Sequence, residues 1–359
     1  MPEGIVELPI NMENVECVTE CWTYNRMIIL KTSPYYEDWI ASHYNLFATK
    51  NNTYNYSFLF GETRAYTPDY YDDILVRKQI NYFEQTEDGF VDTLKGMIRG
   101  GSYVNIMVKP YPEKEWFHEL VLYGYNDNEK LFKGVGLEKH FFQQRDYTYE
   151  FFENTLPIMK EHFKDKQRRG VGLSMQFQYP ISAFRLREGY SSEGCVFEAF
   201  RKIRAELDGE RFIRDRLKNV GVYEQTGMIY RGISCLDALS NYINDILDGK
   251  TSQGGLAKCI KKLYEHRRMM IVSMKYLQKK WEKAIHSQII TESITGYEEC
   301  NLIVEKWVNL SIKYELTGNQ ELLKKIVEEI PKVFLHEYDS LSRLVNHCVS
   351  WDEFNQEFI

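Results

Sequence analysis

The pattern of apolar residues changes near Gly194, and this change restricts the possible folds more than any other feature of the chain. Before it, short stretches of alternating apolar and polar residues are separated by Tyr, Asn and Gly, which is typical of strands. After it, apolar residues recur about every 3.6 positions over long segments that end at Gly-containing stops. The sequence therefore predicts an α+β protein with strands in its N-terminal half and helices in its C-terminal half.

The expected elements follow from these two periods. In the N-terminal half, strands are expected at Tyr103–Val108, His118–Tyr125, Lys130–Val135, Gly172–Tyr179 and Ile181–Leu186, and helices at Val18–Lys31, Pro34–Tyr44, Asp69–Gln85, Phe90–Ile98 and Tyr149–His162. In the C-terminal half, helices are expected at Val196–Leu207, Leu236–Leu247, Leu256–Trp281, Tyr297–Leu316, Gln320–Ile330 and Val333–Val349. Pro331 is expected to kink or end a helix. We expect two domains, 1–165 and 166–359.

Composition excludes several classes of function. The chain has 359 residues, 43% of them hydrophobic, and a net charge of -7 without a long basic run, so no nucleic acid is expected as a partner. Apolar runs are too short to span a membrane, and residues 1–12 lack the features of a secretory signal. Seven scattered cysteines suggest neither a disulfide framework nor a metal site. We expect a soluble, cytoplasmic protein.

Two cysteines lie where the first helix is expected to begin. Cys17 and Cys21 occur within Asn14–Tyr24, just before the apolar run Met27–Leu30. The N–H groups and the dipole at a helix start stabilise a thiolate, which is the nucleophilic form of cysteine. The alternative is that both are small core residues on one helical face. The sequence leaves both interpretations open.

A histidine starts the second expected strand. His118 opens the segment His118–Asp127, about one hundred residues after the cysteines. A thiol enzyme needs an imidazole on rigid backbone opposite the cysteine helix, although a lone strand histidine is more often structural. The combination of an early cysteine and a later strand histidine favours a papain-like enzyme.

The same segments carry a resemblance to a known family. The chain resembles the butirosin biosynthesis protein H family, most clearly in the sequence His-Glu-Leu-Val-Leu-Tyr-Gly-Tyr-Asn-Asp at 118–127. The other segments that carry the resemblance are the cysteine segment and the stretches 130–132, 149–152, 232–242 and 264–270. The resemblance implies a papain-like, bacteriocin-peptidase-like fold in the N-terminal half. It also implies acyl transfer from a carrier protein onto an amine. A papain-like amide synthase of closthioamide assembly is a similar case.

The resemblance leaves the nucleophile open. Cys17 matches the peptidase-like spacing, with Asn11 where those enzymes keep an oxyanion amide. Cys21, followed by a tryptophan, is similar to the cysteine of papain and is preferred. His118 is implied as the base. Related peptidases carry an aspartate on the next strand, whereas the equivalent stretch Phe132–Gly136 has no carboxylate.

The resemblance therefore implies a cysteine-dependent amide synthase of antibiotic biosynthesis that works through an acyl-cysteine intermediate. The implied partners are an acyl or peptidyl carrier protein and a small amine. The phosphopantetheine arm would arrive as part of the substrate, and no cofactor or metal is expected. Two alternatives stay open. One is a non-catalytic binding protein on a degenerate thiol-enzyme fold, which the missing carboxylate favours. The other is a cysteine peptidase.

Overall fold

A computed structural model of the chain describes residues 4–43, 45–51, 56–61, 71, 73–109, 118–138, 141–168, 181–209, 211–214, 227–251, 254–280 and 287–347. The chain forms two compact units, one of residues 1–36 and 71–190 and the other of residues 37–70 and 191–359. This division differs from the expected boundary at 165/166. The segment 37–70 contributes a helix and two strands to the C-terminal unit, an arrangement that local sequence patterns do not reveal.

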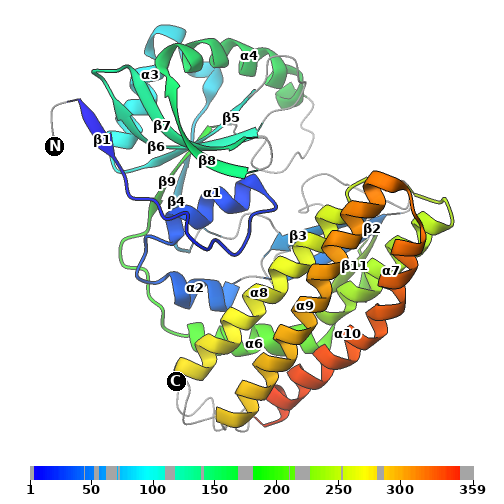
Figure 1. Ribbon diagram of the computed structural model, residues 1–359. Coiled ribbons are helices and arrows are strands. Elements are labelled where there is room, and N and C mark those ends of the chain that lie inside the picture. Colours follow the sequence, from blue (N-terminus) through cyan, green and yellow to red (C-terminus); the bar gives the residue numbers. More distant parts are fainter. Residues whose placement is uncertain are drawn as a thin grey trace. The chain divides into compact units, whose positions relative to one another are not determined.

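The first unit is built on a seven-stranded antiparallel sheet, among the described residues, with the order β4-β9-β5-β6-β7-β8 and β1 beside β6 (Figure 1). The strands are β1 Ile5–Glu7, β4 Leu75–Gln79, β5 Tyr103–Val108, β6 His118–Asn126, β7 Leu131–Glu138, β8 Phe141–Thr148 and β9 Ile181–Leu186. The helices are α1 Cys21–Leu30, α3 Glu87–Arg99 and α4 Tyr149–Arg168, with a short 3-10 helix, η1, at Tyr82–Glu84.

Helices cover both faces of this sheet (Figure 1). On one face, Ile106 and Leu120 belong to an apolar core that includes residues of α3 and α4. On the other face, α1 contacts Asn105 and Glu119, the neighbours of those residues along β5 and β6. Successive side chains of a strand point to opposite faces, so the two-sided cover explains why β5 is buried at every residue.

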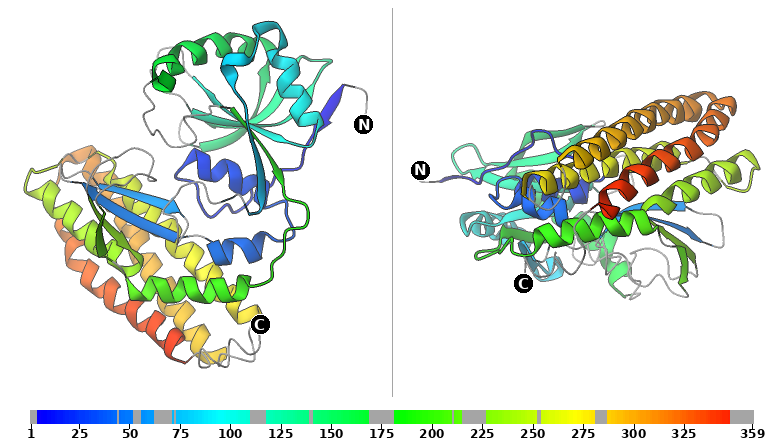
Figure 2. Two further views of the ribbon diagram at one scale, coloured as in Figure 1. Left: turned by 180° about the vertical axis from the view of Figure 1, so that it is seen from behind. Right: turned by 90° about the horizontal axis from the view of Figure 1, so that it is seen from below.

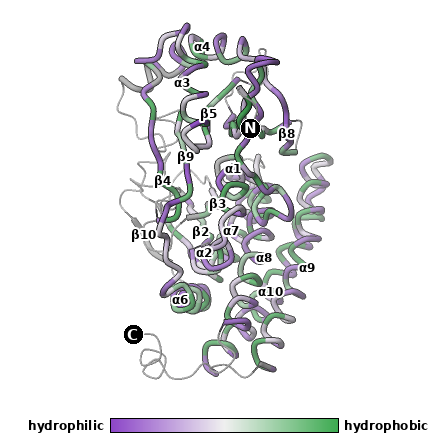
Figure 3. The backbone as a smooth tube through the Cα atoms, turned by 90° about the vertical axis from the view of Figure 1, so that its left-hand side faces the viewer, coloured by the Kyte–Doolittle hydropathy of each residue, from purple (hydrophilic) through white to green (hydrophobic). Residues whose placement is uncertain are grey.

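The second unit combines long helices with a small antiparallel sheet of order β10-β11-β2-β3. Its helices are α2 Tyr36–His43, α6 Cys195–Asp208, α7 Cys235–Leu247, α8 Leu256–Lys280, α9 Ser287–Thr317 and α10 Glu321–Asn346, and a 3-10 helix, η2, spans Gly232–Ser234. Its strands are β2 Asn45–Asn51, β3 Tyr56–Gly61, β10 Arg211–Arg214 and β11 Gly227–Arg231. Helices α8, α9 and α10 lie side by side (Figure 2). Hydropathy alternates along α9 and α10, as expected of helices with one buried face (Figure 3).

The α+β class and the helical C-terminal half are confirmed, with several local corrections. The helix expected at Asp69–Gln85 is wrong, because Leu75–Gln79 forms β4. The expectation that the chain is helical after about residue 195 missed β10 and β11, which complete a sheet with β2 and β3. Pro331 does not end a helix, since α10 continues through it. The strand expected at 172–179 lies outside the described residues.

Gly232 is a position where the fold requires glycine. Its φ is 59°, and a Cβ there would lie 2.4 Å from the backbone oxygen of Glu206. We expect Gly232→Ala to lower the unfolding free energy by about 2–4 kcal/mol, because left-handed strain and a backbone clash add together. Gly249→Ala is the control: its φ is 71° but nothing lies within 4 Å, so only the strain applies. Equal losses in urea unfolding for the two variants would contradict the clash.

Candidate functional site

The first helix begins later than the sequence predicted, and this separates the two candidate cysteines. Helix α1 starts at Cys21 rather than at Val18. Cys21 is therefore the first helical residue and is partly exposed, whereas Cys17 precedes the helix and is fully buried. The first turn of a helix leaves N–H groups that the helix itself does not use. Of the two thiols, Cys21 has the position that favours a thiolate.

The segment that carries Cys17 is held in place by its own contacts. Tyr36 donates a hydrogen bond to the carboxylate of Glu16, and Lys31 Nζ lies 3.7 Å from that carboxylate. Lys31 also donates to the backbone oxygen of Asn14 at 3.1 Å. The Asn11 side-chain oxygen accepts from the Glu13 N–H at 3.0 Å, so this amide closes a local turn. These contacts give the segment a structural role.

The N-terminal half of α1 lies over the end of the sheet where β6 and β8 begin. Tyr24 stacks on Phe142 with ring centroids 3.9 Å apart, and Arg26 lies 3.6 Å from Glu119. Phe142 and Glu119 are the second residues of β8 and β6. Cys21 and His118, which is the first residue of β6, therefore belong to the same end of the first unit.

Strand alternation puts His118 on the other face of the sheet from α1. His118 pairs with Val108, which belongs with Leu120 to the core formed with α3 and α4. Its neighbour Glu119 points toward α1. The structure thus brings the predicted cysteine and histidine to one end of the sheet but assigns their side chains to opposite faces. Contact between the Cys21 thiol and the His118 imidazole stays a prediction.

A carboxylate follows the histidine on the next strand, although sequence reasoning missed it. Strand β7 extends to Glu138, two residues beyond the stretch Phe132–Gly136 that has no carboxylate. The pairs Val121–Val135 and Leu122–Gly134 fix the register of β6 and β7. By alternation along each strand, Glu138 shares the face of Gly134 and His118 shares the face of Leu122, so both belong to the same face of the sheet. Glu138 also pairs with Arg145 at 3.1 Å. The alternation of residues along this strand, followed to its last residue, would have revealed Glu138 from the sequence.

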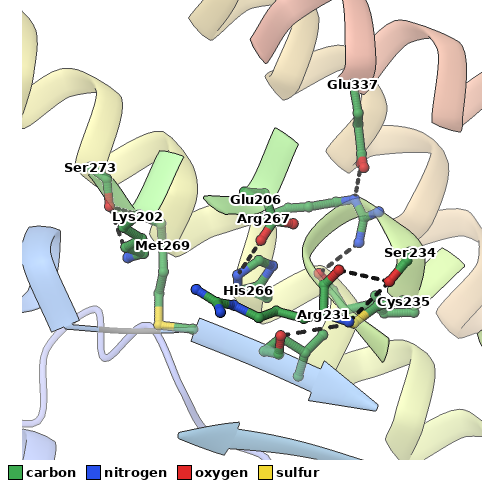
Figure 4. Close-up of polar contacts among 12 residues, drawn as sticks. Lys202, Glu206, Arg231, Ser234, Cys235, His266, Arg267, Met269, Ser273 and Glu337 are labelled. Atoms are coloured by element: carbon green, nitrogen blue, oxygen red, sulfur yellow. Dashed lines mark hydrogen bonds and ion pairs between the residues drawn. The ribbon is translucent and has the colours of Figure 1, made fainter. Parts of the chain in front are cut away.

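The second unit contains a buried cluster of charged side chains (Figure 4). Lys202 and Glu206 extend from α6, His266 and Arg267 from α8, and Glu337 from α10, and each is at least nine-tenths buried. Lys202 Nζ donates to Ser273 Oγ at 3.0 Å, and His266 Nε2 lies 3.6 Å from Glu206. Arg267 pairs with Glu337 and donates to the Leu263 carbonyl at 3.1 Å. The hydrophobic pattern along the chain gave no sign of this cluster.

Burial changes the acid–base properties of this cluster. It lowers the pKa of Lys202 to about 7 and raises that of Glu206 to about 8. Burial, and then the Lys202 and Arg267 charges, hold the pKa of His266 well below its usual range, so that its imidazole is neutral. Burial and Glu206 raise the pKa of the Cys235 thiol, which disfavours a reactive thiolate. Among the described residues, no group of three or more His, Cys, Asp or Glu could hold a metal ion.

Lys202 should make the stability of the protein depend on alkaline pH. Its folded pKa of about 7 lies below the ordinary 10.5, so the folded state binds fewer protons between these values and stability rises with pH. Glu206 acts oppositely up to about pH 8, so the rise should emerge between about pH 8 and 10. We expect Lys202→Met to remove this rise and to stabilise the protein at pH 7 by a few kcal/mol.

The measurement is urea unfolding of wild type and variant at pH 7, 8, 9 and 10. Lys275→Met serves as the control, because Lys275 lies on α8 in an exposed pair with Glu298. Parallel stability curves for wild type and Lys202→Met would contradict the assigned titration.

A polar groove of about 420 Å³ lies between α9 and α10 in the second unit. Glu292, Glu299, His336, Asp339 and Arg343 are among its lining residues, and Arg343 lies 3.7 Å from Glu292. The groove lining includes no thiol, so it is not a candidate site for cysteine chemistry.

No protein-family model matches this chain, and no curated protein matches it. In the part of the chain that the structure describes, no helix is both long enough and apolar enough to cross a membrane.

Proposed function

We propose that this chain is a cysteine-dependent acyltransferase that makes an amide from a thioester-bound acyl group and an amine. The observation that carries the proposal is the position of Cys21, at the first residue of α1 and partly exposed. Cys17, Cys195, Cys235, Cys259 and Cys300 are all buried, so Cys21 is the accessible thiol among the described cysteines. A thiolate at a helix start is a suitable nucleophile for an activated carbonyl.

The reaction proceeds through two acyl transfers. The Cys21 thiol loses its proton to a base, and its sulfur attacks the thioester carbonyl. The bond from the acyl carbon to the donor sulfur then breaks, and the donor leaves as a thiol that takes up the proton. The amine nitrogen next attacks the acyl-cysteine, loses a proton, and expels Cys21 as the amide forms. Backbone N–H groups at the start of α1 would hold the oxyanion in both steps.

The base of the proposal is His118, with Glu138 of β7, on the same face of the sheet, as its proposed carboxylate partner. Because His118 begins β6 on the face away from α1, its imidazole has to reach the thiol around the end of the strand. Thioesters need less help from a base than amides do, since their leaving group is itself a thiolate. This favours thioester donors over peptides.

The resemblance to the butirosin biosynthesis protein H family supports the same reaction. It supplies the proposed donor, an acyl group on the phosphopantetheine arm of a carrier protein, and the proposed acceptor, a small amine of antibiotic biosynthesis in the cytoplasm. No cofactor is part of the proposed chemistry.

The proposal is tested by incubating the purified protein with an acyl-N-acetylcysteamine thioester and a primary amine. We expect mass spectrometry to show the amide, with little cleavage of a peptide of comparable size. Peptide hydrolysis as fast as amide formation would indicate a peptidase. Absence of any product with a series of thioesters and amines would favour the non-catalytic binding protein.

Replacing His118 should slow the reaction without abolishing it. A positioned base contributes about 10²–10⁴-fold, so we expect His118→Ala to lower kcat for amide formation by this factor. His336→Ala, on α10 of the second unit, should leave kcat unchanged and controls for the loss of an imidazole. An unchanged kcat in His118→Ala would exclude His118 as the base.

A further inference from the structure

Four buried polar side chains connect α1 to the sheet beneath it. Asn25 and Arg26 belong to α1, Asn105 to β5 and Glu119 to β6, and none is more than 6% exposed. Asn25 Nδ2 donates to Asn105 Oδ1 at 3.1 Å. Arg26 lies 3.6 Å from the Glu119 carboxylate, which lies on the same face of the sheet as Asn105. One buried polar contact thus joins α1 to β5 and a second joins it to β6.

The hydrogen bond between the two amides fixes how each is turned. Asn25 donates to Asn105, so the Asn105 oxygen faces α1. No described residue donates to Asn25 Oδ1, so the orientation of the Asn25 amide is set by its bond to Asn105.

Asn25 lies on the helical face that carries the candidate nucleophile. Asn25 lies four residues after Cys21, and residues at this spacing share one face of a helix. The N-cap residue of α1, Glu20, makes no side-chain capping hydrogen bond. The start of α1 is therefore positioned by contacts with the sheet rather than by its own cap. Arg26 is further held with its guanidinium 4.8 Å from the centre of the Phe184 ring.

We propose that Asn25 and Asn105 act as one positioning unit for Cys21, anchored by Glu119 and Arg26, an inference that rests on the proposed thiol chemistry. The two amides hold the N-terminal half of α1 at a fixed place on β5, and Arg26 and Glu119 join the helix to β6. Loss of either amide lets the helix start shift, and the thiolate then loses part of its stabilisation by the N–H groups. Because the two amides act in series, loss of both has the same effect as loss of one.

The test is a double-mutant cycle with Asn25→Leu, Asn105→Leu and the double variant. Alkylation of Cys21 by iodoacetamide is followed across pH by peptide mass spectrometry. We expect each single variant to raise the midpoint of the pH profile by about one unit, equivalent to about tenfold less thiolate near neutral pH. The double variant should show the same midpoint as either single variant, which is the non-additivity of a shared unit.

Asn301→Leu controls for the substitution itself. Asn301 lies on α9 in the second unit, and no described residue donates to its side-chain oxygen either, so its replacement should leave the Cys21 profile unchanged. If the leucine variants unfold, Asn105→Ser replaces them, because a hydroxyl on the shorter side chain is too far from Asn25 to accept its hydrogen bond.

Two results would overturn the proposal. One is that the variants fold with lowered thermal stability but keep the alkylation midpoint of the wild type, which would show that the network is purely structural. The other is an additive shift in the double variant, which shows two independent amides. Alkylation requires no acyl transfer, so the two proposals can fail separately. If the wild type forms no amide but the variants show the non-additive shift, the proposed function is refuted and the positioning role of the two amides is retained.

Discussion

Cys21→Ala should abolish amide formation, with product falling to the rate of the uncatalysed reaction. The variant removes the sulfur that forms the acyl-enzyme, and no neighbouring described thiol can replace it, because the others are buried. Folding should be little affected, since Cys21 is partly exposed and alanine is a good helix former. The measurement is the initial rate of amide formation from an acyl thioester, with circular dichroism to confirm the fold.

Cys17→Ala is the matched control for this substitution. Cys17 lies before α1 and is fully buried, so its replacement should cost some stability but retain most of the activity. The opposite outcome, an inactive Cys17→Ala beside an active Cys21→Ala, would transfer the nucleophile to Cys17. Full activity in the double variant would place the chemistry elsewhere in the chain.

Glu337→Gln should destabilise the second unit strongly, by about 3–5 kcal/mol. The substitution keeps the shape of the side chain but leaves Arg267 without its carboxylate in a site where Arg267 is only 2% exposed. A guanidinium cannot escape the cost of burial by losing its proton. We expect a clear decrease in the urea midpoint at neutral pH.

Two further variants define this prediction. Arg267→Met/Glu337→Leu should recover most of the lost stability, because an apolar pair of similar volume avoids the buried charge. Glu321→Gln removes the carboxylate of an exposed pair with Lys324 on the same helix and should cost less than about 1 kcal/mol. Similar losses of unfolding free energy in Glu337→Gln and Glu321→Gln would show that burial does not increase the contribution of the Arg267–Glu337 pair to stability.

The helix ends of the C-terminal half could be predicted because they depend on local chemistry. Helices α6 and α9 end directly before Gly209 and Gly318, and both glycines have positive φ. The start of α1 could not be predicted in this way. Its N-cap is Glu20, which is not among the preferred capping residues and gives no boundary signal. Without that signal the expected helix begins at Val18, so the sequence does not show that Cys21 is the first helical residue while Cys17 precedes the helix.

The remaining differences arise from contacts between distant parts of the chain. Strand β2, which also pairs with β3, pairs with β11, whose sequence lies more than 150 residues later. Helix α10 continues through Pro331 because Ile330 and Val333 are buried against its neighbours, and this packing outweighs the lost hydrogen bond. The charged cluster was missed because Glu206, Arg267 and Glu337 occupy buried positions that a hydrophobic pattern assigns to solvent.

The face on which each candidate side chain lies also required the structure. The sequence placed His118 at the start of a strand, and the strand is confirmed. Whether its side chain points toward α1 depends on which face α1 covers, and only the contacts of Arg26 and Asn25 establish that. Glu138 became visible in the same way, from the register of β6 and β7.

Covalent capture of the acyl group tests the central claim most directly. Wild-type protein is incubated with an acyl thioester in the absence of amine, digested at low pH, and mapped by mass spectrometry. The account predicts one acyl group per chain, attached to the peptide that contains Cys21, and its release as an amide when an amine is added. A chain that stays unmodified, or that carries the acyl group on any other residue, would contradict the account.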